Sequence, residues 1–537
     1  MRKKLPLLFV LFVAFPAFCF CQQNVILIIA DDLGTDYCGF YEDAKDTATM
    51  PNIRSMLSKG VRFQNAWASP LCSPTRSGIL TGRYPFRTGV GTVVTGPTSA
   101  DLDTTEITIA KLLRYNAPVQ YATANIGKWH LNQQTNHKLI YPNKYFGYDL
   151  YSGNFLGELS DYYKWYKVTN GIGDTSTTYA TTEYLNDAIN WLDTLPSGKP
   201  FFLWLAFNAP HTPYHKPPDS LHTVPGLTGT TQHINQYPEL YFKAMVEAMD
   251  KETGRLMQWL IAHNKMDSTN LIFIGDNGTA KRVAQIADTA HTKGTLYEYG
   301  VHVPFIVSGP SVINPGRTSD ALIITPDLFA TIAEMAGFSD WKNALPGNIT
   351  VDSRSLMPIV KNQSSVIHDW IFTEQFNPVT DPKDGKAIRN QEYKLIAFDS
   401  GNQELYHLTT DPLEETDLLL QNLTNSDSAN YNYLCNELAT LTGTSPCIIL
   451  TGINETSDGN HFILSLNPAT NQLNINSSIA IEQINIYNIT GQLVLQTKEF
   501  VVDVSGLSKG VYIAEIKPTP KSPKGDLNTV IQRWVKM

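Results

Sequence analysis

Three continuous apolar runs, each ending in polar residues, constrain the fold of this chain most strongly. They occupy residues 24–30, 201–207 and 271–274, and each is typical of a strand buried on both faces. Helix-like patterns lie between them, at 183–192 and 241–261. The alternation predicts an α/β sheet with crossover connections. Ligands bind beyond the carboxyl ends of the strands in such sheets, which is where the polar residues fall.

Oxygen-bearing side chains follow two of these runs. Asp31 and Asp32 come directly after the first run, and Asp276 and Asn277 follow the third. Each pair alone is equally typical of a helix cap or a turn. Adjacent carboxylates repel one another unless a cation or a proton lies between them. Together the two pairs supply four oxygen ligands, which suit Ca²⁺ or Mg²⁺ better than a soft metal.

Residues 72–76 read Cys-Ser-Pro-Thr-Arg and are followed by Ser-Gly-Ile-Leu-Thr-Gly-Arg. A cysteine in such a place is often simply a buried thiol. The whole run, however, resembles the signature of type I sulfatases, in which the cysteine is oxidised after translation to Cα-formylglycine (3-oxoalanine). The resemblance implies that Cys72 carries this aldehyde and that a formylglycine-generating enzyme acts on the chain.

Three further segments resemble that family in the same order along the chain. They are 126–131 (Ile-Gly-Lys-Trp-His-Leu), 208–213 (Asn-Ala-Pro-His-Thr-Pro) and 293–304, which begins Lys-Gly-Thr. A lysine or histidine alone would more often be solvated or structural, so the ordered set carries the inference. Two positions depart from the family: Asn132 replaces a usual glycine, and His302 stands where many relatives carry arginine.

The resemblance also implies roles for individual residues. One divalent ion, usually calcium with magnesium possible, would be held by Asp31, Asp32, Asp276, Asn277 and the formylglycine derived from Cys72. A hydroxyl of the hydrated aldehyde would attack sulfur, and the further catalytic residues would be Arg76, Lys128, His130, His211 and Lys293. The arginine and lysines would stabilise charge on the sulfate oxygens. His211 would protonate the departing alcohol, and His130 would deprotonate the hydrate so that sulfate leaves.

The same resemblance implies an alkaline-phosphatase-like mixed sheet flanked by helices over 22–365. A small C-terminal α+β subdomain is expected over 366–450, with strands at 371–373, 394–398 and 404–408. Cys435 and Cys447 fall at its end, either as a short disulfide loop or as two thiols.

The last part of the chain changes character. A polar linker is expected at 451–460, followed by short alternating strands with turn signals over 461–537, typical of a β-sandwich. This region resembles the C-terminal sorting domain of type IX secretion. A carbohydrate-binding sandwich is the alternative, but the aromatic platform that it needs is weak.

The amino terminus predicts export. Basic residues precede a short apolar run, so residues 1–21 are expected to form a signal peptide, with a lipid-anchored Cys21 as a poorer alternative. With the sorting domain, this predicts a secreted or cell-surface protein that uses the type IX machinery. The net charge of −9 argues against nucleic acid as a partner.

The expected function is therefore a secreted sulfatase that hydrolyses sulfate esters on sulfated polysaccharides or their oligosaccharides. A phosphonate or phosphodiester hydrolase is the alternative within enzymes, and a catalytically dead glycan-binding protein is the alternative outside them. Specificity is expected in the loops at 89–100 and 141–174. The aromatic stretch 162–166 either stacks on sugar rings or simply packs in the interior.

Overall fold

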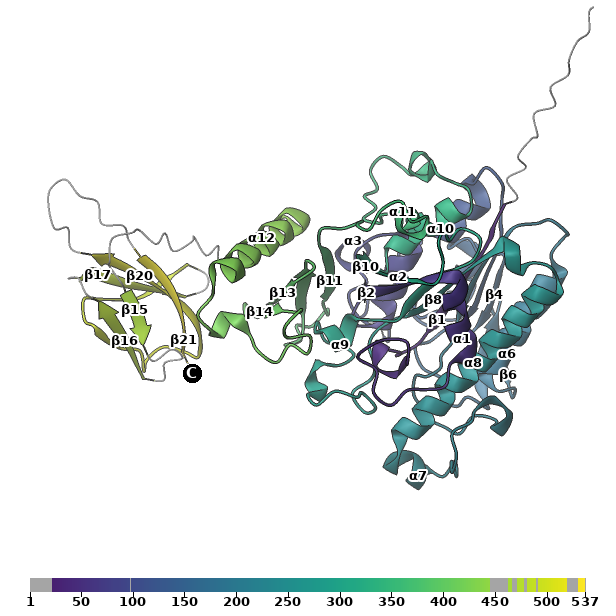
Figure 1. The fold of residues 1–537 in the computed structure, drawn as a ribbon, viewed down its shortest axis with the longest axis horizontal. Helices are drawn as coiled ribbons and strands as arrows, with labels where there is room; N and C mark the ends of the chain where they lie inside the picture. The colour runs from purple at the N-terminus through teal and green to yellow at the C-terminus, as the bar shows by residue number, and fades with distance from the viewer. Residues whose placement is uncertain are drawn as a thin grey trace, which may run out of the picture. The chain divides into compact units, whose positions relative to one another are not determined.

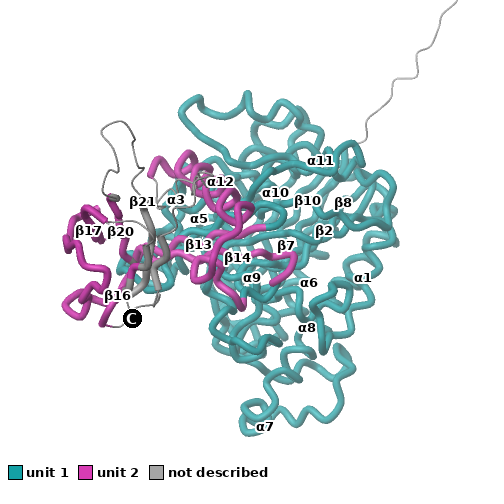
Figure 2. The backbone as a smooth tube through the Cα atoms, turned by 60° about the vertical axis from the view of Figure 1, so that its left-hand side comes forward, with its two compact units in different colours: residues 1–392, 412–414 teal, residues 393–411, 415–537 magenta. Residues whose placement is uncertain are grey.

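The computed structural model describes residues 22–96, 98–444, 462–465, 471–477, 481–488, 491–518 and 530–536. The expected signal peptide (1–21) and linker (451–460) lie outside the described residues. The chain divides into two compact units, one of residues 1–392 with 412–414 and one of residues 393–411 with 415–537 (Figure 2). Among the described helices, none is both long and apolar enough to cross a membrane.

The first unit contains a ten-stranded sheet with the order β10-β2-β9-β8-β1-β7-β3-β4-β5-β6 (Figure 1). Its strands are β1 (Asn24–Ala30), β2 (Gly60–Trp67), β3 (Ala122–Gly127), β4 (Leu150–Gly153), β5 (Trp165–Thr169), β6 (Ile172–Ser176), β7 (Phe201–Ala206), β8 (Thr269–Gly275), β9 (Phe305–Ser308) and β10 (Arg317–Ile324). The central strands β8, β1, β7 and β3 run parallel. Strand β9 is antiparallel to β8 and β2, and β5 is antiparallel to β4 and β6. The expectation of a mixed sheet is confirmed.

Helices cover both faces of this sheet (Figure 1). The α-helices of this unit are α1 (Pro51–Met56), α2 (Cys72–Thr81), α3 (Pro85–Thr88), α4 (Ile109–Lys111), α5 (Tyr141–Lys144), α6 (Ala180–Thr194), α7 (Thr231–Gln236), α8 (Pro238–Ala262), α9 (Glu298–Val301), α10 (Asp327–Met335) and α11 (Met357–Val360). The helix patterns at 183–192 and 241–261 fall within α6 and α8.

Strand β1 explains why its sequence is apolar without interruption. Val25, Leu27 and Ile29 belong to one core, which also includes residues of α2 and α10. Ile26 and Ile28 belong to a second core on the other face, with residues of α6 and α8. Because each face of the strand packs under helices, no position after Asn24 is left for a polar side chain until the strand ends before Asp31.

Two antiparallel pairs follow the large sheet. The first unit contains β11 (Ile371–Gln375) paired with β12 (Gly385–Arg389). The second unit contains β13 (Tyr393–Phe398) paired with β14 (Gln403–His407), and helix α12 (Asn425–Thr442). The three expected strands correspond to β11, β13 and β14. Cys435 in α12 is disulfide-bonded, and Cys447 lies outside the described residues.

The end of the chain contains two small antiparallel sheets. One holds β15 (Phe462–Ser465), β16 (Gln472–Ser477) and β19 (Val501–Asp503), and the other holds β17 (Ile481–Asn488), β18 (Leu493–Thr497), β20 (Gly510–Pro518) and β21 (Val530–Lys536). Leu473 and Ile475 of β16 share one buried core with Ile484 of β17 and Ile516 of β20. The two sheets therefore pack as a sandwich.

Candidate active site

The candidate residues meet at the carboxyl ends of the four central parallel strands. Asp31 follows β1, Asp276 follows β8, Lys128 follows β3, and His211 lies in the loop after β7. Cys72 is the first residue of α2, which follows the loop after β2. Because neighbouring parallel strands end at the same edge, residues far apart in sequence come together there.

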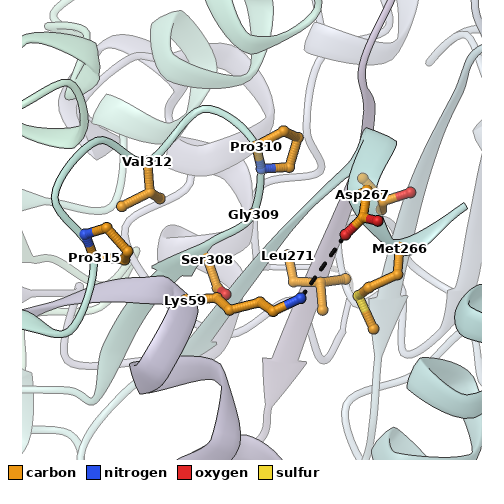
Figure 3. A pocket seen from close by; sticks show the side chains of 10 residues that line it. Lys59, Met266, Asp267, Leu271, Ser308, Gly309, Pro310, Val312 and Pro315 are labelled. Atoms are coloured by element: carbon orange, nitrogen blue, oxygen red, sulfur yellow. Dashed lines mark ion pairs between the residues drawn. The ribbon is translucent and has the colours of Figure 1, made fainter.

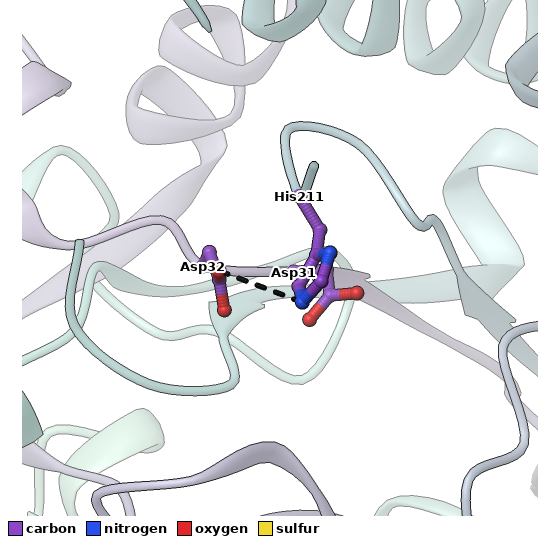
Figure 4. A group of neighbouring side chains, drawn as sticks. All are labelled: Asp31, Asp32 and His211. Carbon is purple, nitrogen blue, oxygen red and sulfur yellow. Dashed lines mark ion pairs between the residues drawn. The ribbon is translucent and has the colours of Figure 1, made fainter. Parts of the chain in front are cut away.

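The oxygen-bearing side chains form one buried cluster. The backbone nitrogen of Asp32 donates to Asp276 Oδ1 at 3.1 Å, and Asn277 Nδ2 donates to Asp32 Oδ1 at 2.9 Å. One carboxylate oxygen each of Asp31 and Asp276 and the Cys72 sulfur all lie within 4.8 Å of one another. Ligand atoms of Asp31, Asp32 and His211 form a second such group, which Figure 4 shows.

This cluster has the properties of a hard-cation site. Asp31 Oδ1 and Asn277 Oδ1 are buried and have no hydrogen-bond partner among the described residues. Burial raises the pKa of Asp31 well above its usual value, and the nearby Asp276 and Asp32 add to this rise while Lys128 opposes it. Unpaired buried oxygens beside like charges are stabilised by a cation, so the donor set fits Ca²⁺ or Mg²⁺.

Three cationic side chains surround the carboxylates. Lys128 Nζ lies 2.6 Å from Asp31 Oδ2, and Lys293 Nζ lies 2.6 Å from Asp32 Oδ1. The guanidinium of Arg76 donates to Asp276 Oδ2 through Nε at 3.1 Å and Nη2 at 2.7 Å, and Nη1 donates to the Lys128 carbonyl at 3.0 Å. Burial alone would lower the pKa of Lys293, but Asp32 and the other anionic groups outweigh it and raise that pKa. Lys293 is therefore held charged, and Asp276 likewise raises the pKa of Arg76 against the opposing effect of burial.

Cys72 lies against this cluster and beside a histidine. Its sulfur is 3.2 Å from His130 Nδ1. Burial raises the pKa of the Cys72 thiol above its usual value, and Lys128 and Lys293 only partly offset this. The thiol is therefore neutral at physiological pH and a poor nucleophile as it stands.

His130 is fixed in place by its backbone. It has a positive φ of 57°; its backbone nitrogen donates to the Phe155 carbonyl at 3.2 Å, and its own carbonyl accepts from Ser73 Oγ at 2.8 Å. Burial and then the charge of Lys128 lower the pKa of His130 well below its usual value. The imidazole is therefore neutral, and Nε2 is buried without a partner among the described residues.

His211 is oriented by its neighbour. Its Nδ1 lies 3.0 Å from the Thr212 carbonyl oxygen, so Nδ1 carries a hydrogen and donates it. Its Nε2 is 3.8 Å from Asp32 Oδ2 (Figure 4). Burial lowers the pKa of His211 to about 4, with Asp32 acting in the opposite direction.

Residues 154–163, here called the site wall, connect His130 and His211. The sequence motifs did not mark this segment as a unit. Gly157 packs so closely that an added Cβ would lie 2.2 Å from His130 Cε1. Tyr162 Oη lies 2.8 Å from the carbonyl oxygens of both Asn208 and His211. Sequence motifs do not reveal these contacts, because they join residues from separate loops.

The decisive comparison is with protein families. The model of the sulfatase family matches residues 23–338. The chain belongs to the sulfatase family. Two further models match: the C-terminal part of N-sulphoglucosamine sulphohydrolase at 289–440, and the secretion system C-terminal sorting domain at 467–524. Members hydrolyse sulfate esters, so the chain is a sulfatase.

Individual sulfatases are similar over most of the chain. Arylsulfatase G of Mus musculus is 26% identical over 431 residues, covering 71% of this chain and 77% of that protein. Steryl-sulfatase of Homo sapiens is 26% identical over 434 residues, covering 65% and 72%. The crystal structure of Ps i-CgsB in complex with k-i-k-neocarrahexaose has a TM-score of 0.66 and 26% identity, covering 82% of this chain and 96% of that one.

The two departures from the sulfatase motifs have structural roles in this chain. Asn132 is buried; its Oδ1 accepts from Trp129 Nε1 at 3.0 Å, and its Nδ2 donates to the Leu102 carbonyl at 3.1 Å. His302 Nε2 lies 2.7 Å from the Gln64 carbonyl oxygen and therefore donates to it. Both side chains are thus engaged in hydrogen bonds with other residues of the chain.

A pocket of about 230 Å³ lies elsewhere in this sulfatase (Figure 3). Its lining includes Thr269, which begins β8, whereas Asp276 follows the other end of that strand. Lys59 and Asp267 line the pocket and form an ion pair at 3.8 Å. Both are exposed, so the pair contributes little to the stability of the fold. The pocket is separate from the candidate active site.

Proposed function

We propose that this sulfatase removes sulfate from sulfated polysaccharides or their oligosaccharides, using a formylglycine derived from Cys72 and a divalent ion. The observation that supports the proposal best is the buried cluster in which four oxygen-bearing side chains, three cations and two histidines surround residue 72. Sulfate esters resist hydrolysis because the sulfuryl group is anionic and repels nucleophiles. A site that attacks them needs fixed positive charge and a strong nucleophile.

We assign the ion to Asp31, Asp32, Asp276, Asn277 and residue 72, with Ca²⁺ as the expected metal and Mg²⁺ as the alternative. The ion would supply positive charge beside the sulfate oxygens, and the hydrated aldehyde would supply the attacking hydroxyl. The unpartnered oxygens of Asp31 and Asn277 support this assignment.

Arg76, Lys128 and Lys293 would bind the sulfate oxygens and stabilise the charge that develops on them. Each is already placed by a carboxylate of the cluster, so little reorganisation is needed when substrate binds. The charges of Lys128 and Lys293 both lower the pKa of the Cys72 thiol, which supports a role for them beside the reacting atoms.

The two histidines suit opposite proton transfers. His130 is neutral and has Nδ1 3.2 Å from the side chain of residue 72, so it is suited to accept a proton there. His211 has Nδ1 committed to the Thr212 carbonyl, so Nε2 is the atom that would give a proton to the departing alcohol. A bound sulfate would favour this protonated form, because its negative charge raises the pKa of a nearby imidazole.

Two findings support an extracellular carbohydrate as substrate. The sorting-domain match at 467–524 favours export to the cell surface or beyond, where polymers are met before they are degraded. The structure of Ps i-CgsB holds a neocarrahexaose. We therefore propose that the chain is exported by a signal peptide and the type IX machinery, and that it acts on a sulfated glycan.

The test is to produce the protein with and without a formylglycine-generating enzyme. Mass spectrometry of the peptide containing residue 72 should show exchange of thiol for aldehyde only in the first preparation. That preparation should release sulfate from an aryl sulfate far faster than it cleaves an aryl phosphodiester. Equal turnover by both preparations would overturn the formylglycine assignment, and preference for the phosphodiester would favour the alternative hydrolase.

A further inference from the structure

The site wall ends in an aromatic cluster. Tyr162, whose hydroxyl contacts the carbonyls of Asn208 and His211, packs its ring on His215 with centroids 4.1 Å apart. Tyr179 donates its hydroxyl hydrogen to His215 Nε2 at 3.0 Å, because His215 Nδ1 donates to the Pro213 carbonyl at 2.9 Å. The cluster is thus tied to the loop that carries His211.

Tyr163 is the exposed member of this cluster. Its hydroxyl donates to the Lys216 carbonyl at 2.7 Å, and its ring lies 5.1 Å from that of Tyr179 and 6.0 Å, edge-on, from that of His215. It nevertheless leaves 41% of its surface exposed. A large ring held in one orientation at the surface loses little freedom when a ligand packs on it.

The surroundings of Tyr163 combine an uncharged imidazole with carboxylates, among them Asp161, which accepts from the Tyr163 backbone nitrogen at 2.6 Å. Burial lowers the pKa of His215 to about 4, so the histidine is neutral at physiological pH. Closer to His211, the exposed Glu158 accepts from Thr212 Oγ1 at 3.0 Å and offers a carboxylate to ligand hydroxyls. A sugar ring presents this combination, with apolar C–H faces and hydroxyls around its edge.

We infer that Tyr163 is a stacking platform for a sugar ring of the substrate, next to the unit whose sulfate enters the site. The inference rests on the proposed function, which supplies the class of substrate. It adds the position at which the neighbouring sugar ring binds. It also decides between the two interpretations of the stretch 162–166: Tyr162 and Trp165 are buried packing residues, whereas Tyr163 contacts ligand.

Tyr166 provides a matched control. It has the same side chain, lies three positions along, and is 43% exposed. Its hydroxyl lies over Gly173 of the neighbouring strand β6, where an added Cβ would be 1.7 Å from it. Tyr166 therefore packs on the β5–β6 hairpin and not in the aromatic cluster.

The experiment compares Tyr163→Ala, Tyr163→Phe and Tyr166→Ala with the unsubstituted enzyme, on an aryl sulfate and on the sulfated oligosaccharide that it desulfates best from a defined panel. For the oligosaccharide we expect Tyr163→Ala to raise KM about three- to tenfold, the range of aromatic contacts. Tyr163→Phe and Tyr166→Ala should keep the original KM. Turnover of the aryl sulfate should be the same in all four, because it lacks the neighbouring sugar ring that Tyr163 is proposed to contact.

A second measurement separates binding from chemistry. In the Cys72→Ala background, calorimetry with the same oligosaccharide should show weaker affinity when Tyr163 is also replaced by alanine. Three results would each reject the platform. They are an unchanged affinity, an equal loss of turnover on both substrates, and an unsubstituted enzyme that cleaves the aryl sulfate but no oligosaccharide of the panel. Absence of aryl-sulfate turnover in the unsubstituted, aldehyde-bearing enzyme would instead reject the proposed function.

Discussion

Lys128 and Asp31 form an ion pair that solvent does not reach, with Nζ 2.6 Å from Oδ2. The other oxygen of Asp31 has no hydrogen-bond partner among the described residues, and Arg76 Nη2 stays 3.9 Å from it. One carboxylate therefore holds a lysine through one oxygen and keeps the other free of hydrogen bonds from the described residues, beside Arg76 and within the cluster that contains Cys72 and Asp276. Charge balance around the proposed ion depends on this division.

The first prediction concerns metal binding. Calcium at about 100 times its Kd should stabilise the fold by about 2.7 kcal/mol, and Asp31→Asn should remove most of this gain. Thermal unfolding with calcium and with a chelator measures it. Asp36→Asn is the matched control, since Asp36 is equally buried but accepts from Thr279 Oγ1 and the Gln285 backbone nitrogen. An equal calcium response in both variants would contradict the assignment.

The second prediction concerns residue 72. Cys72→Ala should lower aryl-sulfate turnover by about 10⁴-fold or more, because it removes the proposed nucleophile. Cys38 is the matched control: among the described residues it is the other free cysteine, and it is also buried. Cys38→Ala should retain turnover. Sulfate release by correctly folded Cys72→Ala at the original rate would disprove the mechanism.

The third prediction tests the contact between the site wall and His130. Gly157→Ala would place a Cβ 2.2 Å from His130 Cε1, so the ring must shift from its present position beside residue 72. Displacement by about 1 Å costs up to about 10²-fold in rate, and we expect a fall in kcat of that order. Gly347→Ala, whose added Cβ meets nothing within 4 Å, should leave kcat unchanged. Steady-state kinetics of the two variants decides the matter.

The fourth prediction concerns stability and pH. Burial raises the pKa of Asp36 to about 6, above its value of 3.8 in the unfolded chain. Because the folded state binds the proton more tightly, lowering the pH from 7 to 4 should stabilise the protein through this group, by about 2 kcal/mol. Asp36→Asn lacks this titration. The difference in free energy of unfolding between the two proteins should therefore shift in favour of the unsubstituted protein as the pH falls. A difference independent of pH would contradict this.

The fifth prediction concerns the carboxy-terminal sandwich. The proposed catalytic residues end at Lys293, so removal of the chain from residue 451 onward should leave turnover of a soluble aryl sulfate unchanged. In the native host the same truncation should stop export across the outer membrane. Normal export together with weaker binding to polymeric substrate would show that the sandwich is a carbohydrate-binding module instead.

The sequence was sufficient to predict three of the four central parallel strands, β1, β7 and β8, and the polar residues after them, whereas β3 was not predicted. Buried parallel strands are apolar throughout, so the first polar residue, Asp31 after β1, marks the edge where ligands bind. The motif around Cys72 added chemistry that spacing alone does not contain. Antiparallel β9 and the β5–β6 hairpin were not predicted, because short strands resemble loops in sequence. Gly157 was missed for another reason: its function lies in a contact with His130 that only the folded chain creates.

The hydrogen bonds of the Tyr162 hydroxyl have a consequence for engineering. Its hydroxyl contacts two carbonyls, those of Asn208 and His211, while its neighbour Tyr163 is the proposed sugar platform. Glycan preference could be exchanged by grafting the 141–174 loop from another sulfatase. Such a graft would also change the position of His211, the histidine proposed to protonate the leaving group. The substrate preference can therefore be changed without disturbing the proton donor only if the graft keeps Tyr162.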